Sequence, residues 1–136
     1  MVNQVHRLWG ADMRAGILIK LFRELMKDVY TQVPGHVTGF DPVKQLAQVQ
    51  IGISSETASG EIVTPGAIIE CPVHFSGGGG WSVDHKLSPG NEGMISFSQR
   101  CIDGWRQTGG VATNPVARFH DKNDAFFTPG FRSNNN

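Results

Sequence analysis

The apolar and polar positions near the N-terminus follow the pattern of an amphipathic helix. Apolar side chains recur every four residues, with others beside them on the same face: Met13, Ile17, Leu18, Leu21, Phe22, Leu25, Met26 and Val29. The spacing predicts a helix over residues 12–31, capped by Asp12 and ended by Pro34, which cannot continue a helix, and by Gly35. Because one face is so apolar, the helix is expected to pack on its own domain or on another chain.

From His36 to about Arg106 the pattern changes to the period of two that is typical of β-strands. Ala47, Val49, Ile51 and Ile53 alternate with polar residues, and turn residues separate the runs. The predicted strands are 36–41, 45–53, 67–75, 81–87 and 94–99. Five short strands with long loops predict a mainly β fold, an OB-like five-stranded Greek-key barrel with an N-terminal amphipathic helix and an extended C-terminal tail. An SH3-like barrel fits the same strands.

Three segments follow from these patterns. Residues 1–33 form the N-terminal helical segment, residues 34–106 the OB-like barrel, and residues 107–136 an extended Phe-rich tail. The tail begins with a Gly-rich linker and then concentrates aromatic residues without a clear period. These aromatic residues are Phe119, Phe126, Phe127 and Phe131.

Charge and cysteine content narrow the function classes. The 12 basic and 12 acidic residues cancel, so the chain lacks the basic footprint of a nucleic-acid-binding protein and the polybasic attraction to a membrane surface. Cys71 and Cys101 do not form a C-x-x-C pair, and we expect both to be free thiols in a reducing cytoplasm. No signal peptide and no membrane-spanning run are legible.

Candidate chemistry is sparse. No two of the five histidines have the close spacing that metal sites favour. The glycine run at 77–80 is followed by a strand-like segment rather than the Lys-Ser/Thr and helix of a phosphate-binding loop. Asp103, Asp121 and Asp124 are most simply turn residues, and the tryptophans are packing residues. We therefore expect no catalytic residue, no metal and no cofactor, and no enzymatic activity. The histidines are His6, His36, His74, His85 and His120.

Several motifs together resemble the N-terminal domain of the membrane-piercing spikes of contractile-tailed phages. They are "VPGHVTGFDP", "LAQVQIGI", "ECPVHFSGGGGWS", "LSPGNEGMISFSQRCIDGW" and "RFHDKNDAFFTPGF", and they cover about Val33 to Arg132. The resemblance implies a homotrimer of OB barrels on the tail axis, beneath a baseplate hub protein. That family carries a β-helical shaft after the barrel, often with an apical iron ion. Here only "RSNNN" follows Phe131, so the shaft is absent, on another chain or outside this sequence, and a separate spike-tip protein is a further expected partner.

The resemblance implies a structural virion protein that closes the tail tube and supports piercing of the host outer membrane. It would be located in the tail baseplate after assembly in the host cytoplasm, with no nucleic-acid partner and only indirect membrane contact. A monomeric OB module that binds single-stranded nucleic acid or oligosaccharide is the alternative. The expected interface residues are Ile17, Leu21, Phe22, Leu25, Trp81, Trp105, Phe126, Phe127 and Phe131. The expected loop and turn residues are Gly77, Gly78, Gly79, Gly80, Pro89 and Gly90.

Overall fold

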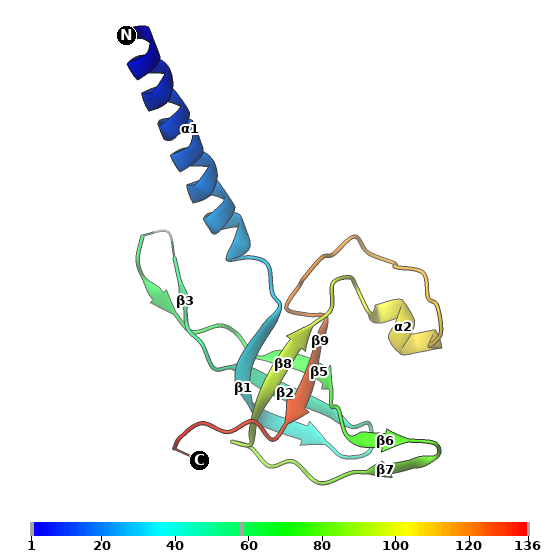
Figure 1. Ribbon diagram of the computed structural model, residues 1–136. Coiled ribbons are helices and arrows are strands. Elements are labelled where there is room, and N and C mark those ends of the chain that lie inside the picture. Colours follow the sequence, from blue (N-terminus) through cyan, green and yellow to red (C-terminus); the bar gives the residue numbers. More distant parts are fainter. Residues whose placement is uncertain (1, 58, 136) are drawn as a thin grey trace.

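The computed structural model describes residues 2–57 and 59–135, with side chains from residue 13 onward except at position 69. A long helix, α1 (Val2–Met26), precedes a β-sheet domain, and a short helix, α2 (Asp103–Thr108), lies in the connection before the last strand (Figure 1). The strands are β1 Gln32–Asp41, β2 Leu46–Ile51, β3 Ser55–Glu56, β4 Ile62–Val63, β5 Ile68–Pro72, β6 Ser76–Gly78, β7 Trp81–Val83, β8 Glu92–Phe97 and β9 Ala125–Pro129.

Five of these strands form one curled antiparallel sheet in the order β5-β2-β1-β8-β9. Its two edges approach each other, because Val73 forms an isolated parallel bridge with Phe127. The backbone N–H of His74 also donates to the carbonyl of Phe127 at 2.8 Å. The sheet is therefore a five-stranded half-barrel, consistent with the OB-like fold that the sequence predicts.

The core of the barrel is built from alternate residues of its strands. Ala47, Val49 and Ile51 of β2 are buried, as the alternation predicts, and Ile95 of β8 pairs in register with Phe127 of β9. Fully burying a side chain of this size stabilises the fold by roughly 1.5–3 kcal/mol. The buried hydrophobic cluster comprises Val37, Ala47, Val49, Ile51, Ile68, Cys71, Leu87, Ile95, Phe97, Ala125 and Phe127.

Two glycines allow the sheet to coil tightly at its centre. Gly35 of β1 and Gly93 of β8 are register partners, and both are buried. A Cβ atom at Gly35 would lie 2.5 Å from the Gln50 carbonyl oxygen, and one at Gly93 would lie 2.6 Å from Cζ of Phe127. Neither position has room for a side chain, so strand interiors that would otherwise favour branched residues carry glycine.

The N-terminal helix differs from its predicted limits. It begins well before Asp12 and ends at Met26, not near Thr31. Tyr30 is already held by the barrel, because its N–H donates to the His120 carbonyl at 3.1 Å and its ring packs against Phe97 at 5.1 Å between centroids. Pro34 lies inside β1 and does not end the helix. Contacts with residues distant in sequence therefore override the local helical pattern.

Two strand predictions also need correction. The segment 81–87 contributes no barrel strand, because Trp81–Val83 pairs with β6 in a separate two-stranded sheet. The fifth barrel strand is β9, which lies within the segment expected to be an extended Phe-rich tail. In β9 the buried Ala125 and Phe127 alternate with the half-buried Phe126, which is the period of an ordinary strand.

Candidate functional site

The apolar face of α1 is exposed. In Figure 1 the helix extends away from the barrel, and every described side chain from residue 13 to residue 26 is exposed. The predicted interface residues on it, Ile17, Leu21, Phe22 and Leu25, therefore lie on a projecting rod. Phe22 is 63% exposed and Leu25 is 68% exposed. A solitary helix with such a surface is marginal in water, so this face is a candidate interface.

A polar strip occupies the opposite side of the same helix. Lys20, Arg23, Glu24 and Lys27 follow one another along it, and Lys27 Nζ lies 3.0 Å from Glu24 Oε1. Within the described residues, no helix is long and apolar enough to cross a membrane. The helix has one polar face and one apolar face.

The glycine run forms a β-hairpin rather than a flexible hinge. β6 pairs with β7 through Ser76–Val83, Gly77–Ser82 and Gly78–Trp81. The turn residues Gly79 and Gly80 have φ values of 56° and 85°, which favour glycine and suit the tight turn of a two-residue hairpin. A Cβ atom at Gly77 would lie 2.8 Å from the Trp81 carbonyl oxygen. The glycines are therefore required by the hairpin itself.

This hairpin carries an exposed aromatic side chain beyond the barrel core. Trp81 is 61% exposed, and Val83 on the same strand is also exposed. In Figure 1 the hairpin extends from the barrel at a distance from α1. Exposed tryptophans on rigid ribbons are typical anchors of protein interfaces. Trp81 is therefore the second candidate contact point.

The predicted turn at Pro89 and Gly90 has a structural role in the barrel. Gly90 has a φ of 93°, and the Asn91 side-chain oxygen accepts a hydrogen bond from the Ser88 N–H at 2.7 Å. The turn also bonds to β1, because the Gly90 N–H donates to the Val37 carbonyl at 2.8 Å. Pro followed by Gly at its centre is the pattern of a type II turn. It positions the start of β8.

The aromatic residues of the C-terminal segment divide between core and surface. Phe127 is 0% exposed and fills the barrel, so the prediction that it forms an interface is wrong. Phe126 is half-buried and packs its ring edge-on against Trp105 of α2, with centroids 6.0 Å apart. Trp105 and Phe131 are exposed. Phe119 of the same segment is also exposed, at 63%, so Phe119, Phe131 and the neighbouring Trp105 offer the largest free surfaces.

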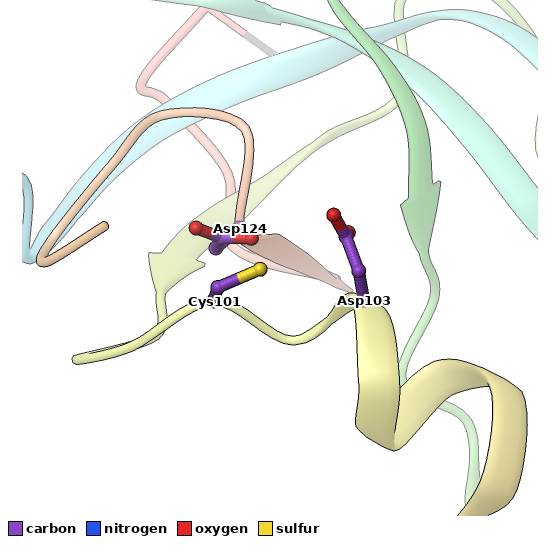
Figure 2. A group of neighbouring side chains, drawn as sticks. All are labelled: Cys101, Asp103 and Asp124. Atoms are coloured by element: carbon purple, nitrogen blue, oxygen red, sulfur yellow. The ribbon is translucent and has the colours of Figure 1, made fainter. Parts of the chain in front are cut away.

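A polar cluster at the N-terminal end of α2 was not predicted from the sequence. Figure 2 shows Cys101, Asp103 and Asp124 close together, and their ligand-type atoms lie within 4.8 Å of one another. Arg118 contacts all three, with Nη2 lying 3.1 Å from Cys101 Sγ, 3.2 Å from Asp103 Oδ2 and 2.7 Å from Asp124 Oδ1. Hydrogen bonding to Asp124 raises the pKa of Arg118 further above its ordinary value. The guanidinium occupies the position that a metal ion would need, so the cluster is a structural ion pair.

The described histidines do not gather into a metal site. Among the described side chains, the grouping of potential ligands is the cysteine and aspartate cluster just described. His120 instead places Nδ1 3.0 Å from the Tyr30 carbonyl oxygen, which requires the proton on Nδ1. His85 packs its ring against Phe75, with centroids 5.2 Å apart. The side chain of His6 lies outside the described residues.

An apolar cleft lies where α1 meets the barrel. It has a volume of about 350 Å³ and is lined by residues that follow α1 and by the loop after β2, including Val29, Tyr30, Val33 and Ile53. The β3–β4 hairpin beside it exposes Ile62. No sequence pattern marks this cleft, because its walls come from separate segments, one before and within β1 and the other after β2.

These features define a small OB-like barrel from which an apolar helix and an aromatic hairpin project. The family model of the phage protein Gp138 N-terminal domain matches residues 33–130, and the chain belongs to this family of structural phage proteins. The matched residues contain the barrel from Val33 of β1 to the end of β9, and leave α1 outside. No curated protein matches the chain significantly.

Proposed function

We propose that this chain is the central spike or hub-cap component of a contractile phage tail, acting as a homotrimer. In this role it closes the tail tube beneath the hub protein and supports piercing of the host outer membrane. Its partners are two further copies of itself, the hub protein, and a shaft or tip that completes the spike. The function is mechanical, and catalysis has no part in it.

The observation that carries the proposal is family membership combined with unpartnered apolar surface outside the barrel. The barrel buries its own core, yet the described face of α1 and Trp81 on the β6–β7 hairpin remain exposed. Apolar surface of this kind is covered in a functional assembly or leads to aggregation. A cyclic trimer on the tail axis would cover one such surface between copies and present the other to the hub ring.

The zero net charge supports a protein partner rather than a nucleic acid. Binding to phosphate backbones depends on clustered Lys and Arg, and this chain balances 12 basic with 12 acidic residues. Contacts between protein subunits rely instead on buried aromatic and aliphatic anchors. The exposed residues of α1 and the hairpin are of that kind.

Light scattering coupled to size-exclusion chromatography tests the trimer directly. The full chain at micromolar concentration should elute at three times its 14.8 kDa mass. Electron microscopy of the parent tail should then place this chain on the tail axis, below the hub. A monomer at all concentrations, or a salt-sensitive shift with single-stranded DNA, would overturn the proposal in favour of a monomeric OB module.

A further inference from the structure

The spacing of apolar residues in α1 indicates that its partner is helical. In the described part of the helix, Ala15, Leu18, Phe22 and Leu25 are separated by three, four and three residues. This is the a/d spacing of a heptad repeat, which fits one helix against other helices. Upstream in the sequence, Leu8 and Ala11 continue the spacing, and Gln4 interrupts it. The described residues thus supply two heptads of this spacing, and the sequence extends it to a third.

The width of the apolar face indicates more than two helices. Successive residues of a helix are about 100° apart, so the described apolar positions apart from Met13 cover an arc of roughly 200° from Ile17 to Ile19. Positions beside the a/d seam are apolar as well, namely Ile19, Leu21 and Met26, although Arg14 interrupts the arc. In two-stranded coiled coils these flanking positions are usually charged. Apolar flanks suit a bundle in which each helix contacts two neighbours.

The connection to the barrel limits the direction that α1 can take. Backbone hydrogen bonds from Lys27 to Glu24, from Asp28 to Leu25 and from Val29 to Met26 continue the helix end at 3.1–3.3 Å. The next residue, Tyr30, is clamped to His120 by two hydrogen bonds, at 3.1 Å and 3.0 Å. No long flexible linker separates helix and barrel, so barrels arranged around an axis would carry their helices in matching orientations.

Resting on the trimer proposed above, we infer that three copies of α1 associate as a parallel three-helix coiled coil that extends from the barrels. Leu18, Phe22 and Leu25 form its central layers, and Lys20, Arg23 and Lys27 face water. The partner of the exposed helix face is thus the same face of two further copies of this chain. Rotational symmetry about one axis makes the helices parallel, because all three barrels then lie at the same end.

The matched family residues 33–130 do not include α1, so this assembly element is an addition to the barrel that defines the family.

Paired charge substitutions in the full chain test the coiled coil. Leu18→Glu and Phe22→Glu each place a carboxylate in a central layer, while Lys20→Glu places one on the water-facing strip. Sedimentation equilibrium should show the two central variants raising the trimer dissociation constant at least 10-fold, with Lys20→Glu close to wild type. Urea denaturation followed by circular dichroism should show an intact barrel transition in every variant, because α1 lies outside the barrel core.

Spin labels attached through Met13→Cys and, separately, through Lys27→Cys test the orientation. A parallel bundle should give short distances, on the order of 20 Å, at both positions. A long distance at either position would overturn the parallel arrangement. A wild-type dimer, or a trimer that the Leu18 and Phe22 variants leave unchanged, would overturn the coiled coil. If the trimer persists in the Leu18 and Phe22 variants, the proposed spike function would still stand. A wild-type monomer would overturn both the coiled coil and the spike function.

Discussion

Arg118 donates two parallel hydrogen bonds to the carboxylate of Asp124. Nε lies 3.1 Å from Oδ2, and Nη2 lies 2.7 Å from Oδ1. Asp124 is 0% exposed, and it also accepts a bond from the Ile102 N–H at 3.3 Å, while its carbonyl accepts one from Ser98 at 2.7 Å. Asp124 thus links the two ends of the connection between β8 and β9, in which α2 lies. The guanidinium makes this buried charge tolerable.

Removal of Arg118 should destabilise the barrel strongly. Arg118→Ala leaves the buried Asp124 carboxylate without its cation, and an uncompensated buried charge costs about 3 kcal/mol. Urea denaturation should show this loss in the free energy of unfolding at pH 7, with an unchanged m-value.

Arg118→Lys serves as the matched variant for this prediction. Lysine keeps the charge but cannot form two parallel hydrogen bonds. The free energy of unfolding of Arg118→Lys should therefore lie between those of wild type and Arg118→Ala. A loss below about 0.5 kcal/mol for Arg118→Ala would contradict the role given to the ion pair, because that is the range of ordinary surface substitutions.

The glycine at the centre of β8 should not tolerate a methyl group. Gly93→Ala would place Cβ against the ring of Phe127 and the backbone oxygen of Thr128, and overpacking of this kind costs about 3 kcal/mol. The melting temperature of the barrel should fall accordingly. The control is Gly16→Ala in α1, where a Cβ atom meets nothing within 4 Å. It should leave the barrel transition unchanged and increase the helical circular dichroism signal, since alanine favours helix by about 1 kcal/mol over glycine.

The regular parts of the fold were predictable from local patterns. Ala47, Val49 and Ile51 alternate with polar residues, and this period identified β2 as a half-buried strand. In β9 the adjacent Phe126 and Phe127 hide the same period, because Phe126 is only half-buried and looks equally apolar in the sequence. The strand was therefore assigned to the tail.

Features made by distant residues could not be predicted from spacing. α1 ends at Met26 because Tyr30 bonds to His120, which is 90 residues away. The polar cluster joins Arg118 to Cys101, which is 17 residues away, and no motif marks that pair. The assignment of the α1 face as an interface stays a prediction. Phe127 was misassigned because an aromatic-rich segment has the same composition in a core as on a surface.

Trp81 should matter for assembly and not for folding. Its side chain is 61% exposed on a hairpin outside the barrel core, so Trp81→Ala should change the free energy of unfolding by less than about 0.5 kcal/mol. Loss of an aromatic anchor at an interface typically costs about 2 kcal/mol of binding. Isothermal titration with the hub protein of the same baseplate should therefore show at least a 10-fold weaker affinity. An unchanged affinity would show that Trp81 of the hairpin does not contribute to hub binding.

The hairpin turn provides the matched control for that experiment. Gly79→Asn keeps a residue that tolerates a positive φ, so the hairpin and hub binding should persist. Gly80→Val places a β-branched residue at a φ of 85°, which should distort the hairpin and weaken hub binding while Trp81 is still present. Equal affinities for the two turn variants would show that the presentation of Trp81 by the hairpin is unimportant.

Cys71 should make the stability of the barrel fall at alkaline pH. Burial raises the pKa of its thiol to about 12, whereas a cysteine in an unfolded chain has a pKa near 8.5. Below pH 8.5 both states hold the proton and the full stability is present. Between pH 8.5 and about 12 the unfolded state releases the proton while the folded state keeps it, so the free energy of unfolding decreases by about 1.4 kcal/mol per pH unit.

Comparison with Cys71→Ala isolates this contribution, because lysine and tyrosine titrations are common to both proteins. The alanine variant should be less stable at pH 7, since it loses buried volume. In urea denaturation under reducing conditions, the difference in free energy of unfolding between the two proteins should become steadily smaller from pH 8.5 to pH 10.5. Parallel pH profiles would mean that the folded barrel admits water to Cys71 and lets the thiolate form. Thiol labelling provides a second measurement. Wild-type Cys71 should react only after unfolding, because the thiolate is the reacting species.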